Sequence, residues 1–226
     1  MALALPCLLA SSPLAAQPVA AAPLLDALSI TVQQDSATVA RGSLRLRQVR
    51  TGADLELVAT GTLVRKGLRI TAELRTDSLF GLRRYTAESR DSAGALLDRV
   101  QVTSAGGRVT LERVTPRRRQ VREYFAQRDL MILDSASVVP FVMLAGIAQR
   151  AGGVLFLDVR SGLLTQAQTA PGTAADLTMA EALVSGTPIA VTGLATPLTW
   201  WRDSRGHLLR VVWGTRARVL RDDPPA

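Results

Sequence analysis

The sequence predicts a mostly β protein, folded as a curved antiparallel sheet or open barrel with one short central apolar helix. Two observations carry this prediction. Apolar and polar residues alternate along several segments, which is typical of strands with one buried and one solvated face. Strand and turn signals also recur about every ten to twelve residues, a spacing that favours meanders, sandwiches and open barrels over βαβ folds.

The clearest strands lie between residue 27 and about residue 125. Strict alternation appears in "LRITAELR", where the side chains from Leu68 to Leu74 alternate between apolar and polar. The turn-forming stretches "TGAD" and "RKG" separate the neighbouring segments "SLRLRQV", "LELVATGTLV" and "LRITAELR". Gly106 and Gly107 predict a tight hairpin between two further strands, because glycine adopts positive φ without steric cost.

The pattern changes between residues 134 and 153, which we take as an internal division of the domain. "LMIL" predicts a short strand, and the run 138–148 is apolar on nearly every side. Asp134 or a nearby serine can cap a helix, and Pro140 is tolerated in its first turn. We therefore expect a buried helix or a sheet-plugging segment, too short to span a bilayer.

The N-terminus resembles a signal peptide. Residues 1–16 carry no charge and end in small residues, so we predict cleavage after residue 16 or near residue 22. Removal of Cys7 leaves no cysteine in the remaining chain, which excludes disulfides and thiol chemistry. These features predict an exported protein, periplasmic or secreted, with a single β-rich domain over residues 27–221.

The formal net charge is +8, which indicates an acidic partner such as nucleic acid, anionic lipid or a polyanionic glycan. Lys66 is the only lysine, however, so GC-rich coding bias also explains the excess of arginine. Export argues against nucleic acid as a partner. The densest basic run predicts contact with an anionic membrane surface or an envelope protein, or else a solvated loop; it contains Arg117, Arg118, Arg119 and Arg122 beside Tyr124 and Phe125.

No motif in the chain indicates a known catalytic or metal site. The sequence lacks G-x-S-x-G, H-E-x-x-H, C-x-x-C and the phosphate-cradling glycine loop, and it contains one histidine, His207. We therefore predict no catalytic residue, no metal and no cofactor. One alternative is a hydrolase in which Asp134 and Asp158, each ending an apolar strand, act as acid and base. The other interpretation makes them a helix cap and a turn carboxylate.

The stretch "TWWRDSRGHLLRVVW" predicts a hairpin with Gly206 in the left-handed position and Asp203 paired with His207. This register sets Trp201 across from Leu209 and places it in the core. It leaves Trp200 on a mixed outer face between two arginines. The residues that we predict to contact a ligand are Trp200, Arg202, Arg210, Phe141 and Met143.

The same region carries a resemblance to known proteins. An "ILD" segment, an apolar "LFLDV" strand and a W-x-D-x-x-G-x-L-x-x-V pattern beginning at Trp201 resemble secreted bacterial β-rich proteins of unknown function. The resemblance covers roughly residues 125–221 and implies no catalytic residue. The chain is also similar to periplasmic lipoprotein-carrier folds, in which a curved antiparallel sheet wraps an apolar cavity plugged by helices.

Together these features predict an exported, non-enzymatic binding protein that holds an apolar or amphiphilic ligand, such as a lipid, on its curved sheet. The alternatives are a cell-envelope interaction module that uses a basic surface, and the two-carboxylate hydrolase.

Overall fold

The structure is a computed structural model that describes residues 24–125, 130–144, 153–179, 182–214, 217–223 and 225. The predicted signal peptide lies outside the described residues. The first half of the chain is a meander of long strands: β1 (Leu24–Gln34), β2 (Ala37–Thr51), β3 (Asp54–Arg65), β4 (Leu68–Asp77), β5 (Leu82–Arg90), β6 (Leu96–Ala105), β7 (Arg108–Thr115) and β8 (Arg118–Phe125).

The second half consists of shorter strands and one 3₁₀ helix. Its elements are β9 (Leu130–Leu133), η1 (Val139–Met143), β10 (Gly153–Asp158), β11 (Leu163–Pro171), β12 (Ala175–Met179), β13 (Ala182–Thr192), β14 (Leu198–Arg202), β15 (Leu208–Trp213) and β16 (Ala217–Arg221). The stretch 163–179 thus contributes the strands β11 and β12.

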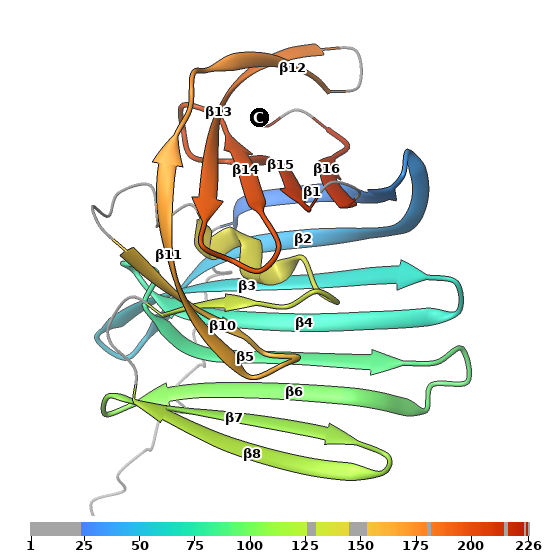
Figure 1. Cartoon of the computed structure of the whole chain (residues 1–226), viewed down its shortest axis with the longest axis vertical. Helices are drawn as coiled ribbons and strands as arrows, with labels where there is room; N and C mark the ends of the chain where they lie inside the picture. Colours follow the sequence, from blue (N-terminus) through green and yellow to red (C-terminus); the bar gives the residue numbers. More distant parts are fainter. Residues whose placement is uncertain are drawn as a thin grey trace, which may run out of the picture.

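The described residues form one 16-stranded sheet in the order β8-β7-β6-β5-β4-β3-β2-β1-β16-β15-β14-β13-β11-β10-β9, with β12 paired to β13. Neighbouring strands are antiparallel except β9 and β10, which are parallel. The pairing of β1 with β16 joins the two halves (Figure 1). The predicted curved, mostly antiparallel sheet is confirmed.

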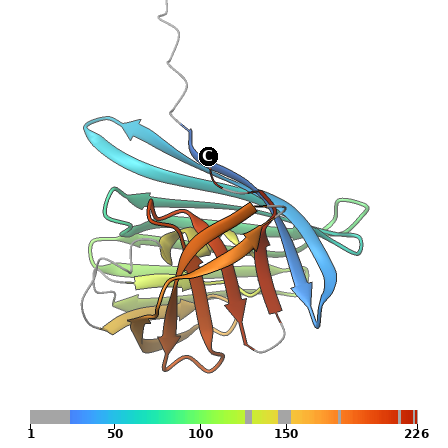
Figure 2. The same ribbon diagram turned by 90° about the horizontal axis from the view of Figure 1, so that it is seen from above.

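The sheet folds over so that its two halves face each other, with η1 between them (Figure 2). A single apolar core fills the space between the layers. It includes Leu74, Tyr85 and Val100 from the meander, and Phe156 and Trp200 from the second half. Strands of the meander contribute alternate residues to this core, as the burial of Ile70, Ala72 and Leu74 in β4 illustrates, whereas all four residues of β9 are buried.

The helix predicted over residues 138–148 is not found in the described residues. Residues 139–143 form a five-residue 3₁₀ helix, with Pro140 in its first turn and no side-chain cap. All five residues are buried, so the expected plugging role holds although the helix type does not. Residues 145–152 lie outside the described part. The plug fits closely, because a Cβ at Gly61 of β3 would lie 2.6 Å from Val139 Cγ2.

The two ends of the strand path, β8 and β9, are not paired with each other, so the described sheet stays open. Side chains bridge part of the gap. Tyr124 of β8 donates a hydrogen bond to the Gly162 carbonyl at 2.8 Å, and Arg122 donates to the Ser161 carbonyl at 2.9 Å. No helix in the described part of the chain has the length and apolar character needed to cross a membrane.

Candidate ligand-binding site

An apolar cleft lies between the start of the meander and the β14–β15 hairpin. Its volume is about 420 Å³, within the range typical of small-molecule sites. The apolar side chains that line it come from β1, β2, the β4–β5 turn, η1, β14 and β15: Leu25, Leu28, Leu44, Leu46, Phe80, Phe141, Val142, Trp200 and Leu208. Leu28 and Leu44 face each other across β1 and β2, so strand alternation alone places them inside.

Trp200 is the largest fully buried side chain of this region, with 1% of its surface exposed. Its indole Nε1 is shielded from solvent and has no hydrogen-bond acceptor among the described residues. An unpaired buried donor costs about 1–3 kcal/mol, so native proteins rarely leave one. Its acceptor must therefore come from outside the described residues, as a buried water or a ligand oxygen would.

Polar residues line the same cleft at β14 and the β14–β15 turn. Arg202 forms no ion pair with any described carboxylate, whereas Asp26 receives two hydrogen bonds from Arg221, at 2.9 and 3.0 Å. His207 Nδ1 lies 2.8 Å from Asp203 Oδ2. Arg221 thus neutralises Asp26 within the protein, and Arg202 is left to interact with an anion.

The pKa of Asp203 reflects this hairpin. Burial acts to raise it, but hydrogen bonds from the ring and backbone of His207 and from the backbone of Arg205 outweigh burial, so the pKa lies below its ordinary value. The same carboxylate closes the turn by accepting hydrogen bonds from the backbone N–H groups of Arg205 and His207. The turn side of the cleft is therefore held in one shape.

Phe80 forms part of the cleft wall in a strained conformation. Its φ is +60°, which is uncommon for a bulky residue and is found mostly where the surroundings enforce it. The Asp77 carboxylate enforces it here by accepting hydrogen bonds from the backbone of Leu79 at 2.9 Å and Gly81 at 2.7 Å. A Cβ at Gly81 would lie 2.5 Å from Asp77 Oδ2, so a larger residue there would displace this carboxylate.

The hairpin register differs from the prediction by one residue. Asp203 and His207 pair as expected, and Gly206 has φ +90°. Trp201, however, lies opposite Arg210, and Arg202 lies opposite Leu208. The extra residue, Leu209, makes a β-bulge that reverses the two faces of the hairpin.

The predicted positions of Trp200 and Trp201 are therefore wrong. Trp200 enters the main core, whereas Trp201 is partly buried against a small separate cluster formed by Leu177, Met179 and Leu209. Of the predicted ligand residues, Trp200, Arg202 and Phe141 line the cleft together. Met143 lies fully buried at the end of η1, outside the cleft lining.

Arg210 belongs to the opposite face of the hairpin, where it lines a separate hollow beside Leu177 and Leu209. The bulge is the physical reason, because it places Leu209 and Arg210 on the side of Trp201. The cleft residues that sequence reasoning missed are Phe80 and the leucines of β1 and β2. Alternation predicts that the side chains of Leu44 and Leu46 face inward. No local sequence pattern predicts the pairing of β1 with β16, which brings these leucines next to the hairpin.

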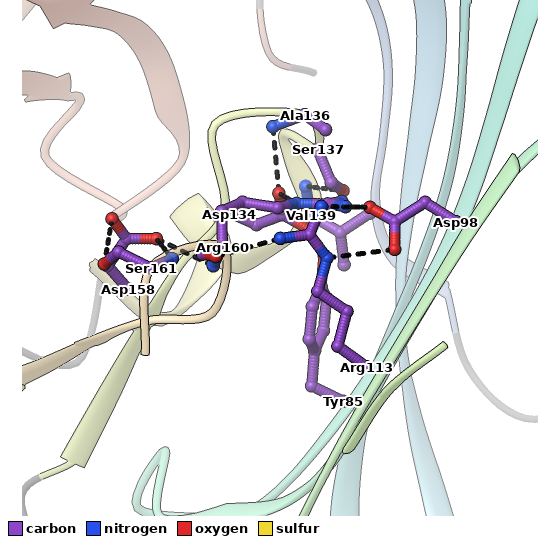
Figure 3. Close-up of polar contacts among 10 residues, drawn as sticks. All are labelled: Tyr85, Asp98, Arg113, Asp134, Ala136, Ser137, Val139, Asp158, Arg160 and Ser161. Carbon is purple, nitrogen blue, oxygen red and sulfur yellow. Dashed lines mark hydrogen bonds and ion pairs between the residues drawn. The ribbon is translucent and has the colours of Figure 1, made fainter. Parts of the chain in front are cut away.

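Asp134 and Asp158 belong to a dense cluster of polar side chains, separate from the residues that line the cleft (Figure 3). The buried Asp134 carboxylate accepts hydrogen bonds from Tyr85 Oη at 2.7 Å, from Ala136 N at 2.9 Å, and from two nitrogens of Arg160 at 2.7 and 2.9 Å. Arg160 also binds Asp98, which in turn pairs with Arg113 at 3.0 Å. The acceptors of Asp134 are all used within the protein.

Asp158 serves a different purpose. It closes its own turn by accepting hydrogen bonds from the backbone of Arg160 at 2.8 Å and from the Ser161 hydroxyl at 2.9 Å. Asp158 and Ser161 stand on one side of the cluster, whereas Asp98 and Arg113 stand on the other (Figure 3). This arrangement fits a turn carboxylate beside a buried ion pair, and no observation on the two carboxylates favours acid–base chemistry.

The burial of this cluster changes the pKa values of two members. Burial, followed by the negative charge of Asp134, holds the pKa of Tyr85 well above its ordinary value. Burial acts to lower the pKa of Arg160, but hydrogen bonds and charge from Asp134 and then Asp98 outweigh it, so that pKa is raised. Arg160 is therefore a fixed cation, and Tyr85 stays a neutral donor.

The arginines of the 117–122 run do not form one patch. Arg119 pairs with Glu112 at 2.9 Å, whereas Arg122 reaches the β10–β11 turn, on the other face of β8. Arg117 and Arg118 lie exposed at the β7–β8 turn. Strand alternation separates residues that the sequence places side by side.

No group of three or more His, Cys, Asp or Glu residues in the described ranges is arranged to hold a metal ion. Comparison of the chain with protein-family models, with curated proteins and with solved structures found no match.

Proposed function

We propose that this protein is an exported binding protein that holds a single-chain amphiphile with an anionic head in the cleft, without acting on it chemically. The observation that carries the proposal is the coexistence of an apolar lining, an unpaired buried indole N–H and an unpaired guanidinium in one cleft. Apolar burial favours the chain of such a ligand, and Arg202 favours its charged head.

The proposed head group is anionic because the surrounding charges leave one sign uncompensated. Asp26 is paired with Arg221 and therefore does not repel an anion strongly, while Asp203 accepts hydrogen bonds from the backbone of its own turn. A carboxylate or phosphate head can accept two hydrogen bonds from Arg202. The predicted export also supports the proposal, because lipids and other amphiphiles dissolve poorly in an aqueous envelope compartment unless a protein binds them.

Calorimetric titration with palmitate tests this proposal, with hexadecanol as the matched uncharged ligand. Arg202→Gln should weaken palmitate binding about tenfold or more, since a hydrogen bond to a charged group contributes about 1.5–3 kcal/mol. It should leave hexadecanol binding nearly unchanged. Arg210→Gln is the matched control, because it removes the same charge from the other face of the same hairpin.

Trp200→Phe tests the indole donor while keeping an aromatic ring. This substitution should weaken the binding of both palmitate and hexadecanol if the head-group oxygen of each accepts a hydrogen bond from Nε1. If palmitate binds wild type, Arg202→Gln and Arg210→Gln with equal affinity, the proposed cleft is contradicted. Native mass spectrometry of protein purified from an envelope extract should show a bound amphiphile that Leu46→Glu abolishes.

A further inference from the structure

The outer face of the meander carries a second hollow, on the side of the sheet away from the core. It covers strands β2 to β6 and has a volume of about 590 Å³. Alternation separates it from the cleft, because Leu44 and Leu46 of β2 face inward whereas Ser43 and Arg45 face outward. We call this hollow the outer trough, and it is lined by Ser43, Arg45, Thr60, Thr62, Thr71, Glu73, Arg84, Thr86, Glu88, Arg99 and Gln101, with backbone at Gly61, Ala72 and Ala87.

Strand register orders ten of these residues into two rows across the sheet, and Arg84 of β5 lies beside the first row. One row runs Arg45, Thr60, Glu73, Thr86 and Gln101, each opposite the next on the neighbouring strand. The second row runs Ser43, Thr62, Thr71, Glu88 and Arg99. Short hydroxyl side chains lie between longer ones in the first row and occupy three successive strands in the second, which explains why the face is hollow.

The charges of the trough do not cancel. Glu73 is paired with Arg75 at 2.7 Å, and Glu88 with Arg90 at 2.8 Å. Arg45, Arg84 and Arg99 form no ion pair with any carboxylate of the described residues. Three guanidinium groups therefore remain available around a polar hollow whose own acidic residues are already neutralised.

We infer that the outer trough binds an acidic polysaccharide chain. The guanidinium groups match carboxylates in bidentate geometry, and the threonine hydroxyls both donate to and accept from sugar hydroxyls. No aromatic side chain lines the trough, so it lacks the stacking platform that single-stranded nucleic acid uses. A concave surface also fits a linear polymer better than it fits a flat bilayer.

The two rows set the direction of the chain. Because the rows cross the strands, a polymer lying along them contacts β2 through β6 in succession and passes from Arg45 to Arg99. This site is independent of the proposed amphiphile cleft, since the two occupy opposite faces of β2. Failure of one proposal leaves the other untouched.

Titration with an alginate decasaccharide tests the inference, with an uncharged maltodecaose as the matched ligand. The triple variant Arg45→Gln, Arg84→Gln, Arg99→Gln should lose about 100-fold in alginate affinity and most of its dependence on salt. The control variant Arg117→Gln, Arg118→Gln, Arg119→Gln removes the same charge from the β7–β8 hairpin and should bind nearly as the wild type does.

Several results would overturn the inference. They are equal loss in both triple variants, unchanged binding in the trough variant, or equally tight binding of a duplex DNA dodecamer or phosphatidylglycerol vesicles at matched charge. Circular dichroism and thermal melting establish that each variant folds. If the triple variant does not fold, Arg84→Gln alone should still weaken alginate binding several-fold, and Thr71→Val, which removes a hydroxyl without changing charge, should weaken it less.

Discussion

Two buried polar sites in this interior differ in how completely their hydrogen bonds are made. The cluster around Asp134 uses each carboxylate oxygen twice, with Tyr85, Ala136 and Arg160 as donors. Trp200 lines the cleft, and its buried indole N–H has no acceptor among the described residues. A saturated cluster holds elements together and leaves nothing for a ligand, whereas an unsaturated donor in a cleft favours binding. The contrast supports the proposed cleft without relying on any catalytic motif.

The largest expected loss of unfolding free energy comes from removing the central carboxylate of the saturated cluster. Asp134→Ala removes the partner of the largely buried Arg160 and of Tyr85, so it should cost about 4 kcal/mol of unfolding free energy. Asp158→Ala removes only turn hydrogen bonds and should cost about 1 kcal/mol. Urea unfolding of both variants measures the difference. Equal losses would mean that the cluster does not distinguish the two carboxylates.

The second effect concerns the two adjacent tryptophans. Trp200→Ala should cost about 3 kcal/mol, the lower end for a buried tryptophan, because the cleft beside it lets solvent fill part of the space. Trp201→Ala should cost about 1 kcal/mol, since it packs only on the small outer cluster. Thermal melts measure both losses. If Trp201→Ala proves more destabilising than Trp200→Ala, the hairpin register without the bulge is the correct one.

A smaller effect is expected at Tyr85, with a pH dependence of known sign. Tyr85→Phe removes one donor from Asp134 and should cost about 1–2 kcal/mol near neutral pH. Because the folded-state pKa of Tyr85 is raised, its contribution is full below about pH 10, the unfolded value, and is lost as pH rises towards the folded value. Unfolding free energies measured from pH 8 to 11 should therefore converge for wild type and Tyr85→Phe; a constant gap would contradict this.

The smallest effect belongs to the polar pair beside the cleft. Asp203→Asn should cost below about 1 kcal/mol, since the pair is partly solvated. The folded-state pKa of Asp203 is lowered, so its contribution is present above about pH 4 and is lost as pH falls through the folded value. Wild type should consequently lose more stability than Asp203→Asn between pH 5 and pH 2. Parallel acid curves would show that the pair does not contribute.

Local signals predicted much of this fold. Alternation located the inward residues of β4, and Gly106 and Gly107 form the expected turn between β6 and β7, with φ of +58° and +76°. These features depend on residues close together in the chain. The turn at Asp203 and His207 was predictable for the same reason.

Other features depend on contacts that no local pattern records. A single extra residue, Leu209, reverses a hairpin face because side chains alternate with a period of two. The apolar run indicated burial correctly for its described residues, 138–144, but apolarity does not distinguish a 3₁₀ turn from an α-helix. The hydrogen bond between Tyr85 and Asp134 joins residues 49 positions apart, so the sequence pattern indicated two strand-end carboxylates but not the tyrosine that donates to one of them.

The pairing of β1 with β16 has a consequence for synthesis. The first eight strands pair with their neighbours in chain order, so each can form as soon as the next is made. The outer edge of β1 stays unpaired until β16 has been made. The ion pair between Arg221 and Asp26 likewise joins residues 195 positions apart. During that interval the nascent chain presents an unpaired strand edge, the kind of surface that recruits other chains. Truncation before Ala217 should consequently yield aggregates of β-rich protein in place of a soluble shortened form.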